Sequence, residues 1–73
     1  MMKEIRVRDN DSGKELCMAG AVLDRGDHYK VGNSNLTLYL NKDECTQFGN
    51  TMKWISEWLT ITIVPLVVAG GAE

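Results

Sequence analysis

The spacing of apolar residues changes at Asn41, and this change determines the fold class that the sequence predicts. Before Asn41, apolar and polar residues alternate, as in Glu4–Asp9, where Ile5 and Val7 lie between charged residues. A period of two is typical of a half-buried strand. After Asn41, apolar residues recur at alternating steps of three and four, which is the period of one helix face. These residues are Cys45, Phe48, Met52, Ile55 and Leu59.

The second pattern predicts a helix from Lys42 to Trp58. Asn41 is a suitable N-cap for this helix, and Glu44 three residues later completes the sequence of a capping box. Gly49 inside the helix would cost about 1 kcal/mol relative to alanine, so a close contact between helix and sheet is the expected compensation.

Five segments are predicted to be strands, because turn-forming clusters of Gly, Asp, Asn and Ser separate the first four of them. They are Glu4–Asp9, Lys14–Leu23, His28–Val31, Leu36–Leu40 and Thr60–Val68. The small residues around Gly20 in the second segment predict a bulge or the close approach of another element. The expected fold is therefore α+β, with the element order β-β-β-β-α-β. A mainly antiparallel sheet of four or five strands carries one amphipathic helix on one face. Residues 1–73 are expected to form a single domain, with 69–73 as a frayed tail.

The composition of the chain indicates what can stabilise so small a core. A chain of 73 residues buries only about 60% of the surface that its unfolded form exposes. Two cysteines and one histidine, without a C-x-x-C pair, fall short of a disulfide framework or a structural zinc site. No metal or cofactor is expected, and association into a homo-oligomer is the favoured support. Because no apolar leader opens the chain, we expect a cytoplasmic protein in which Cys17 and Cys45 are reduced and buried.

Apolar side chains remain after one helix has covered one face of the sheet. Trp54 and Trp58, at positions i and i+4 of the predicted helix, flank its apolar stripe, and a strand of period two cannot turn every residue of Val64–Val68 inward. Tyr and Trp are enriched at binding hot spots. The candidate partner or oligomer surface therefore consists of Trp54, Trp58, Val64, Leu66, Val67 and Val68. The alternative is that both indoles cap the edge of the core.

A basic cluster on one predicted sheet face suggests a second class of function. With an aromatic platform on the same face, it would suit a nucleotide or single-stranded nucleic acid. The residues are Arg6, Arg8, Lys14 and Tyr39. A net charge of −2 argues against nucleic acid in general, and Glu4 and Glu15 favour ordinary cross-strand ion pairs instead.

No motif indicates catalysis or a membrane span. His28 is the single histidine, no nucleophile stands at a recognisable spacing from it, and Asp27 as its chain neighbour in a strand is not expected to orient it. The apolar stretch from Trp58 is shorter than the roughly 20 residues that span a bilayer. We therefore expect a non-catalytic protein-interaction module that binds itself and another protein. Small self-contained chains of this kind are often accessory products of phages and other mobile elements, so blocking of a host enzyme or defence complex is the hypothesis for its role.

Overall fold

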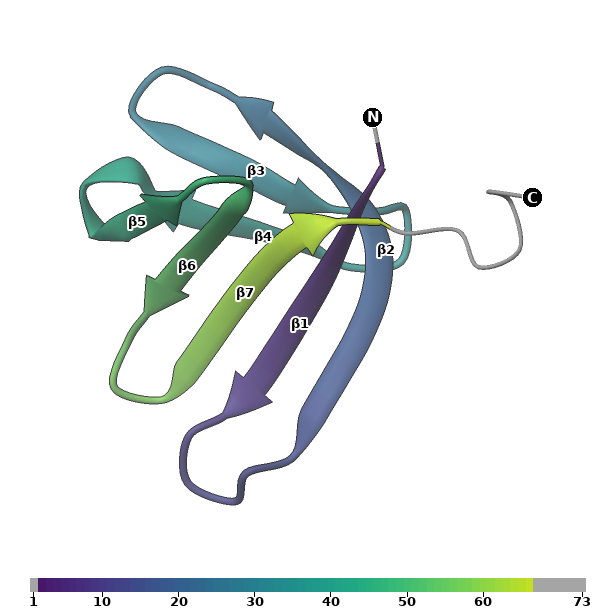
Figure 1. Ribbon diagram of the computed structural model, residues 1–73, viewed down its shortest axis with the longest axis vertical. Coiled ribbons are helices and arrows are strands. Elements are labelled where there is room, and N and C mark those ends of the chain that lie inside the picture. The colour runs from purple at the N-terminus through teal and green to yellow at the C-terminus, as the bar shows by residue number, and fades with distance from the viewer. Residues whose placement is uncertain (1, 67–73) are drawn as a thin grey trace.

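The chain forms seven strands and one short 3-10 turn in a computed structural model that describes residues 2–66 (Figure 1). The strands are β1 (Lys3–Asp9), β2 (Glu15–Asp24), β3 (His28–Gly32), β4 (Thr37–Asn41), β5 (Cys45–Phe48), β6 (Thr51–Ile55) and β7 (Leu59–Pro65), and the turn η1 (Lys42–Glu44) lies between β4 and β5. All seven strands belong to one antiparallel sheet with the order β4-β3-β2-β1-β7-β6-β5.

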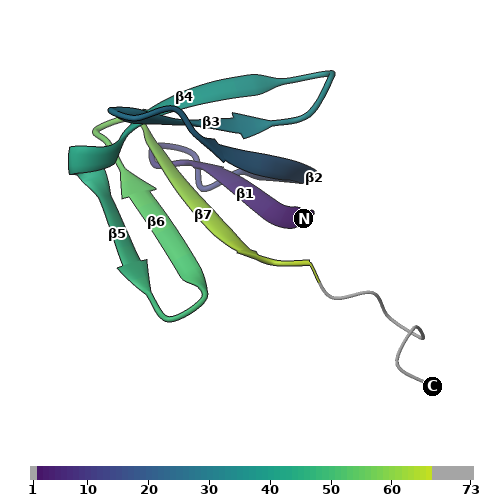
Figure 2. The same ribbon diagram turned by 90° about the horizontal axis from the view of Figure 1, so that it is seen from above.

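The connection between β4 and β5 forces this sheet to curl. The two strands are consecutive in the chain, yet they form opposite edges of the sheet. A flat sheet of seven strands would be about 29 Å wide, whereas the steps from Asn41 to Cys45 span at most about 14 Å. The sheet must therefore bend until its edges meet at η1. Figure 2 shows that β4 and β5 leave this corner in different directions, so the result is an open half-barrel.

The bend passes through β2, which pairs with a different strand along each part of its length. Residues up to Gly20 pair with β1, and residues from Ala21 onward pair with β3. A Cβ atom on Gly20 would lie 2.5 Å from the carbonyl oxygen of Gly32, so the backbones approach more closely than any side chain allows. The close approach that the small residues around Gly20 predict is therefore confirmed, and the approaching element is the end of β3.

Both parts of the bent sheet contribute to one small apolar core on the inner face. Its buried side chains are Ile5, Val31, Leu40, Ile61 and Ile63. They come from β1, β3, β4 and β7, so each part of the sheet covers the inner face of the other. Half-buried apolar side chains, including Met18, Tyr29 and Trp54, surround this cluster.

The helix predicted over Lys42–Trp58 is wrong, and so is the α+β class that depends on it. This segment forms η1, β5, β6 and the turn to β7. Gly49 and Asn50 are the two loop residues of the β5–β6 hairpin, in which Phe48 pairs with Thr51. Gly49 has φ +58°, and no residue other than glycine has positive φ among those described. Positive φ at the first central position alone is the pattern of a type II′ turn, which favours a hairpin.

The apolar stripe that predicts a helix is divided between the two faces of the sheet. Register places Met52 opposite the buried Ile63 on the inner face, whereas Phe48 and Ile55 are exposed. Asn41 does act as an N-cap, since its side chain accepts a hydrogen bond from the Asp43 N–H at 3.0 Å, but only of the single turn η1. The local capping signal was thus real, and its extension into a long helix was not.

The strand segments predicted before Asn41 are confirmed to within one residue at either end. The last predicted strand begins one residue earlier than expected and ends at Pro65; Val67, Val68 and the predicted frayed tail 69–73 lie outside the described residues. Among residues 2–66, no helix has the length and apolar character needed to cross a membrane.

Replacing Gly32 should be far more costly than replacing a glycine in open space. Gly32 has φ +141°, and a Cβ there would overlap the carbonyl oxygen of Leu36. We expect Gly32→Ala to lower the free energy of unfolding by about 2 to 4 kcal/mol. Gly13 also has positive φ but no atom within 4 Å of a built Cβ, so Gly13→Ala should cost about 1 kcal/mol. Urea unfolding of both variants measures the difference, and equal losses would contradict the close contact.

Candidate functional site

The two edge strands are the part of the sheet most open to another polypeptide. β4 and β5 each have one neighbouring strand in the described sheet. Neither contains a charged residue or a proline, although such residues are the usual means of protecting an edge from pairing. Each edge also carries an exposed aromatic ring, with Tyr39 65% and Phe48 61% accessible. The candidate site is therefore a pair of unprotected sheet edges.

The backbone of β4 has a definite orientation relative to its free edge. The N–H of Lys42 donates to the Asp27 carbonyl at 3.3 Å, and the N–H of Asn33 donates to the Leu36 carbonyl at 2.9 Å. These two hydrogen-bonded pairs lie just beyond the two ends of the β3–β4 ladder and keep its register. Along an antiparallel ladder, hydrogen-bonded pairs alternate with pairs that are not hydrogen-bonded. Leu38 and Leu40 therefore bond to β3. The remaining residues of the strand, Thr37, Tyr39 and Asn41, direct their N–H and C=O groups toward the free edge.

An open hollow of about 320 Å³ lies beside β4 on the outer face of the sheet. It exists because Ala21 and Gly32 are too small to fill the space between larger neighbours. Leu23, Lys30 and Thr37 also line it, together with Asn33 and Ser34 of the β3–β4 turn. The sheet edge thus has an adjoining depression that can receive a side chain.

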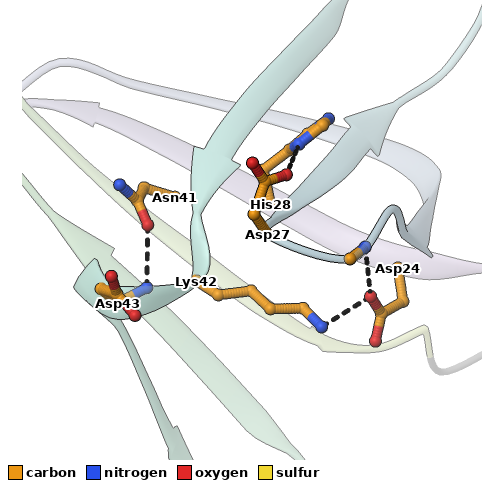
Figure 3. Close-up of polar contacts among 7 residues, drawn as sticks. Asp24, Asp27, His28, Asn41, Lys42 and Asp43 are labelled. Atoms are coloured by element: carbon orange, nitrogen blue, oxygen red, sulfur yellow. Dashed lines mark hydrogen bonds and ion pairs between the residues drawn. The ribbon is translucent and has the colours of Figure 1, made fainter.

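A polar cluster fixes the corner from which the two edges diverge (Figure 3). The ammonium of Lys42 lies 2.6 Å from Asp24 Oδ1 and 5.1 Å from the ring centroid of Tyr29. The N–H of Gly26 donates to the same carboxylate at 2.9 Å. The hydrogen bond from Lys42, followed by that from Gly26, lowers the pKa of Asp24, and the Asp24 carboxylate in turn raises the pKa of Lys42. These contacts join the β2–β3 turn to η1.

His28 contacts Asp27 at this corner, which corrects the expectation that a chain neighbour would not orient it. Asp27 lies in the turn before β3, so its Oδ1 reaches His28 Nδ1 at 2.7 Å. This hydrogen bond is the main cause of the lowered pKa of Asp27. The imidazole also lies 5.7 Å from the Tyr39 ring, tilted by 59°. The described part of the chain holds no group of three potential metal ligands. Asp27 and His28 thus form a hydrogen-bonded polar pair beside the ring of Tyr39.

The structure separates the two tryptophans that the sequence placed on one helix face. Trp54 lies on the inner face of β6, packs against the core, and donates from Nε1 to Glu44 Oε1 at 3.1 Å. Trp58 lies in the β6–β7 turn and is 69% exposed. Val64 is half-buried on the outer face of β7, and Leu66 is exposed just after that strand. Val67 and Val68 of the predicted surface lie outside the described residues.

Asn10 holds the turn that presents Trp58. Its side-chain amide donates to the carbonyls of Ser56 and Glu57 at 2.9 and 3.2 Å, and its Oδ1 accepts from the Thr60 hydroxyl at 2.7 Å. The Asn10 N–H also donates to the Trp58 carbonyl at 3.0 Å. The β1–β2 turn thus braces the β6–β7 turn, and Trp58 is an exposed ring on a fixed support.

The four residues of the predicted nucleic-acid surface do not form one cluster. Arg6 bonds to Glu4 at 2.7 Å, and Arg8 lies directly opposite Glu15. Lys14 lies in the β1–β2 turn. Register aligns Arg6 with Cys17 but aligns Tyr39, through Lys30, with Leu23. These two positions of β2 are six residues apart, about 20 Å along the strand.

The two cysteines differ in environment, and the expectation that both are buried is wrong for Cys17. Cys17 is exposed on the outer face, where it pairs with Arg6. Cys45 is half-buried against the core, and burial raises the pKa of its thiol.

Comparison of the chain with models of known families, with characterised proteins and with solved structures finds no match in any of the three. The sequence reasoning missed Phe48 as an exposed residue of an edge strand. The Gly49-Asn50 pair was the available signal, because it is typical of a hairpin loop.

The tryptophans should respond in opposite ways to truncation. Trp54→Ala removes a half-buried ring from the core and should cost about 2 to 3 kcal/mol, below the value for a fully buried ring. Trp58→Ala should change the free energy of unfolding by less than about 0.5 kcal/mol, as for other exposed positions. Thermal and urea unfolding of both variants measure this contrast. A large loss from Trp58→Ala would show that this ring belongs to the core.

Acid should weaken the corner through Asp24. A lowered pKa in the folded state contributes stability that is complete above the ordinary carboxylate pKa of 3.8 and is lost as pH falls through the folded value. The urea midpoint should therefore fall between about pH 5 and about pH 2. Asp24→Asn keeps an acceptor for Gly26 but removes the charge, so it should show a smaller fall than the unmodified chain. An identical pH profile for the two would exclude a contribution from the Lys42 ion pair.

Proposed function

We propose that this protein is a non-catalytic interaction module that docks on another polypeptide through the open edges of its curled sheet. The observation that carries the proposal is the pair of edges, β4 and β5, which lack charge and proline and each present an exposed aromatic ring. An exposed edge offers a row of main-chain donors and acceptors to an added strand, while neighbouring hollows select side chains.

The small core supports the same function. Only five apolar side chains among residues 2–66 are buried, and large apolar side chains such as Leu23 and Trp58 are exposed. Contact with a partner would cover part of this surface and add to the stability of the fold. Trp58 on its braced turn, and Val64 and Leu66 at the opposite end of β7, are two further candidate contacts for the same function. Blocking of a host enzyme or defence complex remains a hypothesis of this class.

The alternative of a nucleotide or single-stranded nucleic-acid binder has less support. Arg6 is bonded to Glu4, Arg8 lies opposite Glu15, and Tyr39 lies on the other part of the bent sheet. The stacking platform and the basic strip that such a binder needs are therefore apart.

Loss of the exposed ring on either edge should weaken binding without unfolding the protein. Partners are captured from the native host with the unmodified chain and with Tyr39→Ser and Phe48→Ser. Ile55→Ser, which removes an apolar side chain as exposed as Phe48 from β6, a strand that lies between two others, is the matched control. We expect at least one edge variant to bind the purified partner about tenfold or more weakly, or 1.4 kcal/mol, while the control binds normally. Unchanged binding by both edge variants would contradict the proposal.

A further inference from the structure

We infer that the free edge of β4 pairs antiparallel with β4 of a second copy of this chain, forming a two-fold symmetric dimer centred on Tyr39. The inference rests on the proposed interaction function and names one partner for one of the two edges. It follows from the backbone orientation of β4, the order of its side chains, and the hollow beside it.

The backbone groups that face the free edge match themselves under this symmetry. Tyr39 directs its N–H and C=O outward, so two copies exchange a pair of hydrogen bonds across the axis. Thr37 and Asn41 also face outward, and the Asn41 N–H of each copy then meets the Thr37 carbonyl of the other. Moving the axis to Leu38 or Leu40 would pair only two of these three outward-directed residues within β4, whereas an axis at Tyr39 pairs all three.

The side chains of β4 are ordered almost as a palindrome, Thr-Leu-Tyr-Leu-Asn. Antiparallel pairing about Tyr39 therefore places Leu38 of one copy opposite Leu40 of the other, and Thr37 opposite Asn41. A two-fold interface requires such self-complementarity, because the same surface serves both copies. β5 lacks it: in Cys-Thr-Gln-Phe an axis at Thr46 would pair Cys45 with Gln47, and an axis at Gln47 would pair Thr46 with Phe48. This comparison favours a second copy as the occupant of the β4 edge.

Both faces of the paired strands gain contacts. On the inner face, the buried Leu40 and the half-buried Leu38 continue the apolar layer from one copy to the other. On the outer face, the exposed Tyr39 ring of one copy lies within diagonal reach of Thr37 of the other. Thr37 lines the hollow of about 320 Å³, so each ring is placed at the hollow of the opposite copy. β4 has no charged side chain, so the two copies do not repel each other along this edge.

The length of the edge limits the strength of this dimer. Five residues extend about 17 Å, and stable interfaces bury about 800 Å² on each partner. Strand pairing with one ring on each side falls short of that area. We therefore expect a dissociation constant of about 10 to 1,000 μM.

Two measurements on the purified full chain test the dimer without any other component. Sedimentation equilibrium should show a monomer–dimer equilibrium up to about 1 mM, within the range set by the interface size. Residue-resolved hydrogen exchange should show that the N–H groups of Tyr39 and Asn41 become protected as concentration rises. Those of Leu38 and Leu40 should be protected at every concentration, because they bond to β3. A monomer at the highest concentration, or concentration-dependent protection in β5 instead, would overturn the inference.

Charge variants test the position of the axis. Because Tyr39 faces itself in the dimer, Tyr39→Lys and Tyr39→Glu should each prevent self-pairing, and an equimolar mixture should recover a dimer at least about tenfold tighter than either variant alone. Phe48→Lys, the matched change on the other edge, should dimerise normally. Failure of the mixture to associate refutes pairing at Tyr39. The exchange measurement on the unmodified chain decides the inference even where a variant fails to fold.

The measurements of self-association and of partner capture distinguish the dimer from the general interaction function. A chain that stays monomeric yet loses a captured partner through Phe48→Ser or Tyr39→Ser retains the interaction function without the dimer. A chain that dimerises as described but captures nothing has only itself as partner.

Discussion

One short connection governs the architecture: η1 joins the two outermost strands of the sheet with three residues. The sheet can satisfy this constraint only by bending, and the bend brings the inner faces of its two parts together over Ile5, Val31 and Ile61. No second layer is then needed to form a core. The same bend requires the close approach of Gly20 and Gly32, and the ion pair of Lys42 holds the corner where the edges meet.

The η1 connection holds β4 and β5 together at one corner only, and the rest of each edge stays available for binding. Away from η1, β4 and β5 diverge, so neither edge covers the other (Figure 2). A closed barrel would have removed both edges, whereas the half-barrel retains them. The fold therefore obtains a core from few residues and keeps rows of main-chain groups open to other strands. Docking through these edges would reduce the exposed apolar area that so small a core leaves uncovered.

Most strand positions could be predicted from the sequence, but the helix predicted to cover the sheet does not form. Alternation at Ile5 and Val7 and the turn residues between segments located β1 to β4 because both signals are local. The segment after Asn41 was ambiguous, since Cys45, Phe48, Met52 and Ile55 fit a helical stripe while Gly49-Asn50 fits a hairpin loop. Pairing with β7 resolved the ambiguity, and such a long-range contact has no local signature. The site was predictable only in part: Trp58 is exposed, but the status of β4 and β5 as edges depends on strand order.

The position of β1 has a consequence for how the molecule assembles. This first strand lies in the middle of the sheet, and its second partner is β7, so Lys3 pairs with Pro65 and Asp9 with Leu59. Pairings so distant in sequence raise the contact order and slow folding, because a long loop must close before they form. During synthesis, the β1–β2 hairpin would emerge with one flank of β1 vacant until the chain up to Pro65 had left the ribosome. The nascent chain would therefore be most exposed to mispairing at a strand that the finished fold encloses.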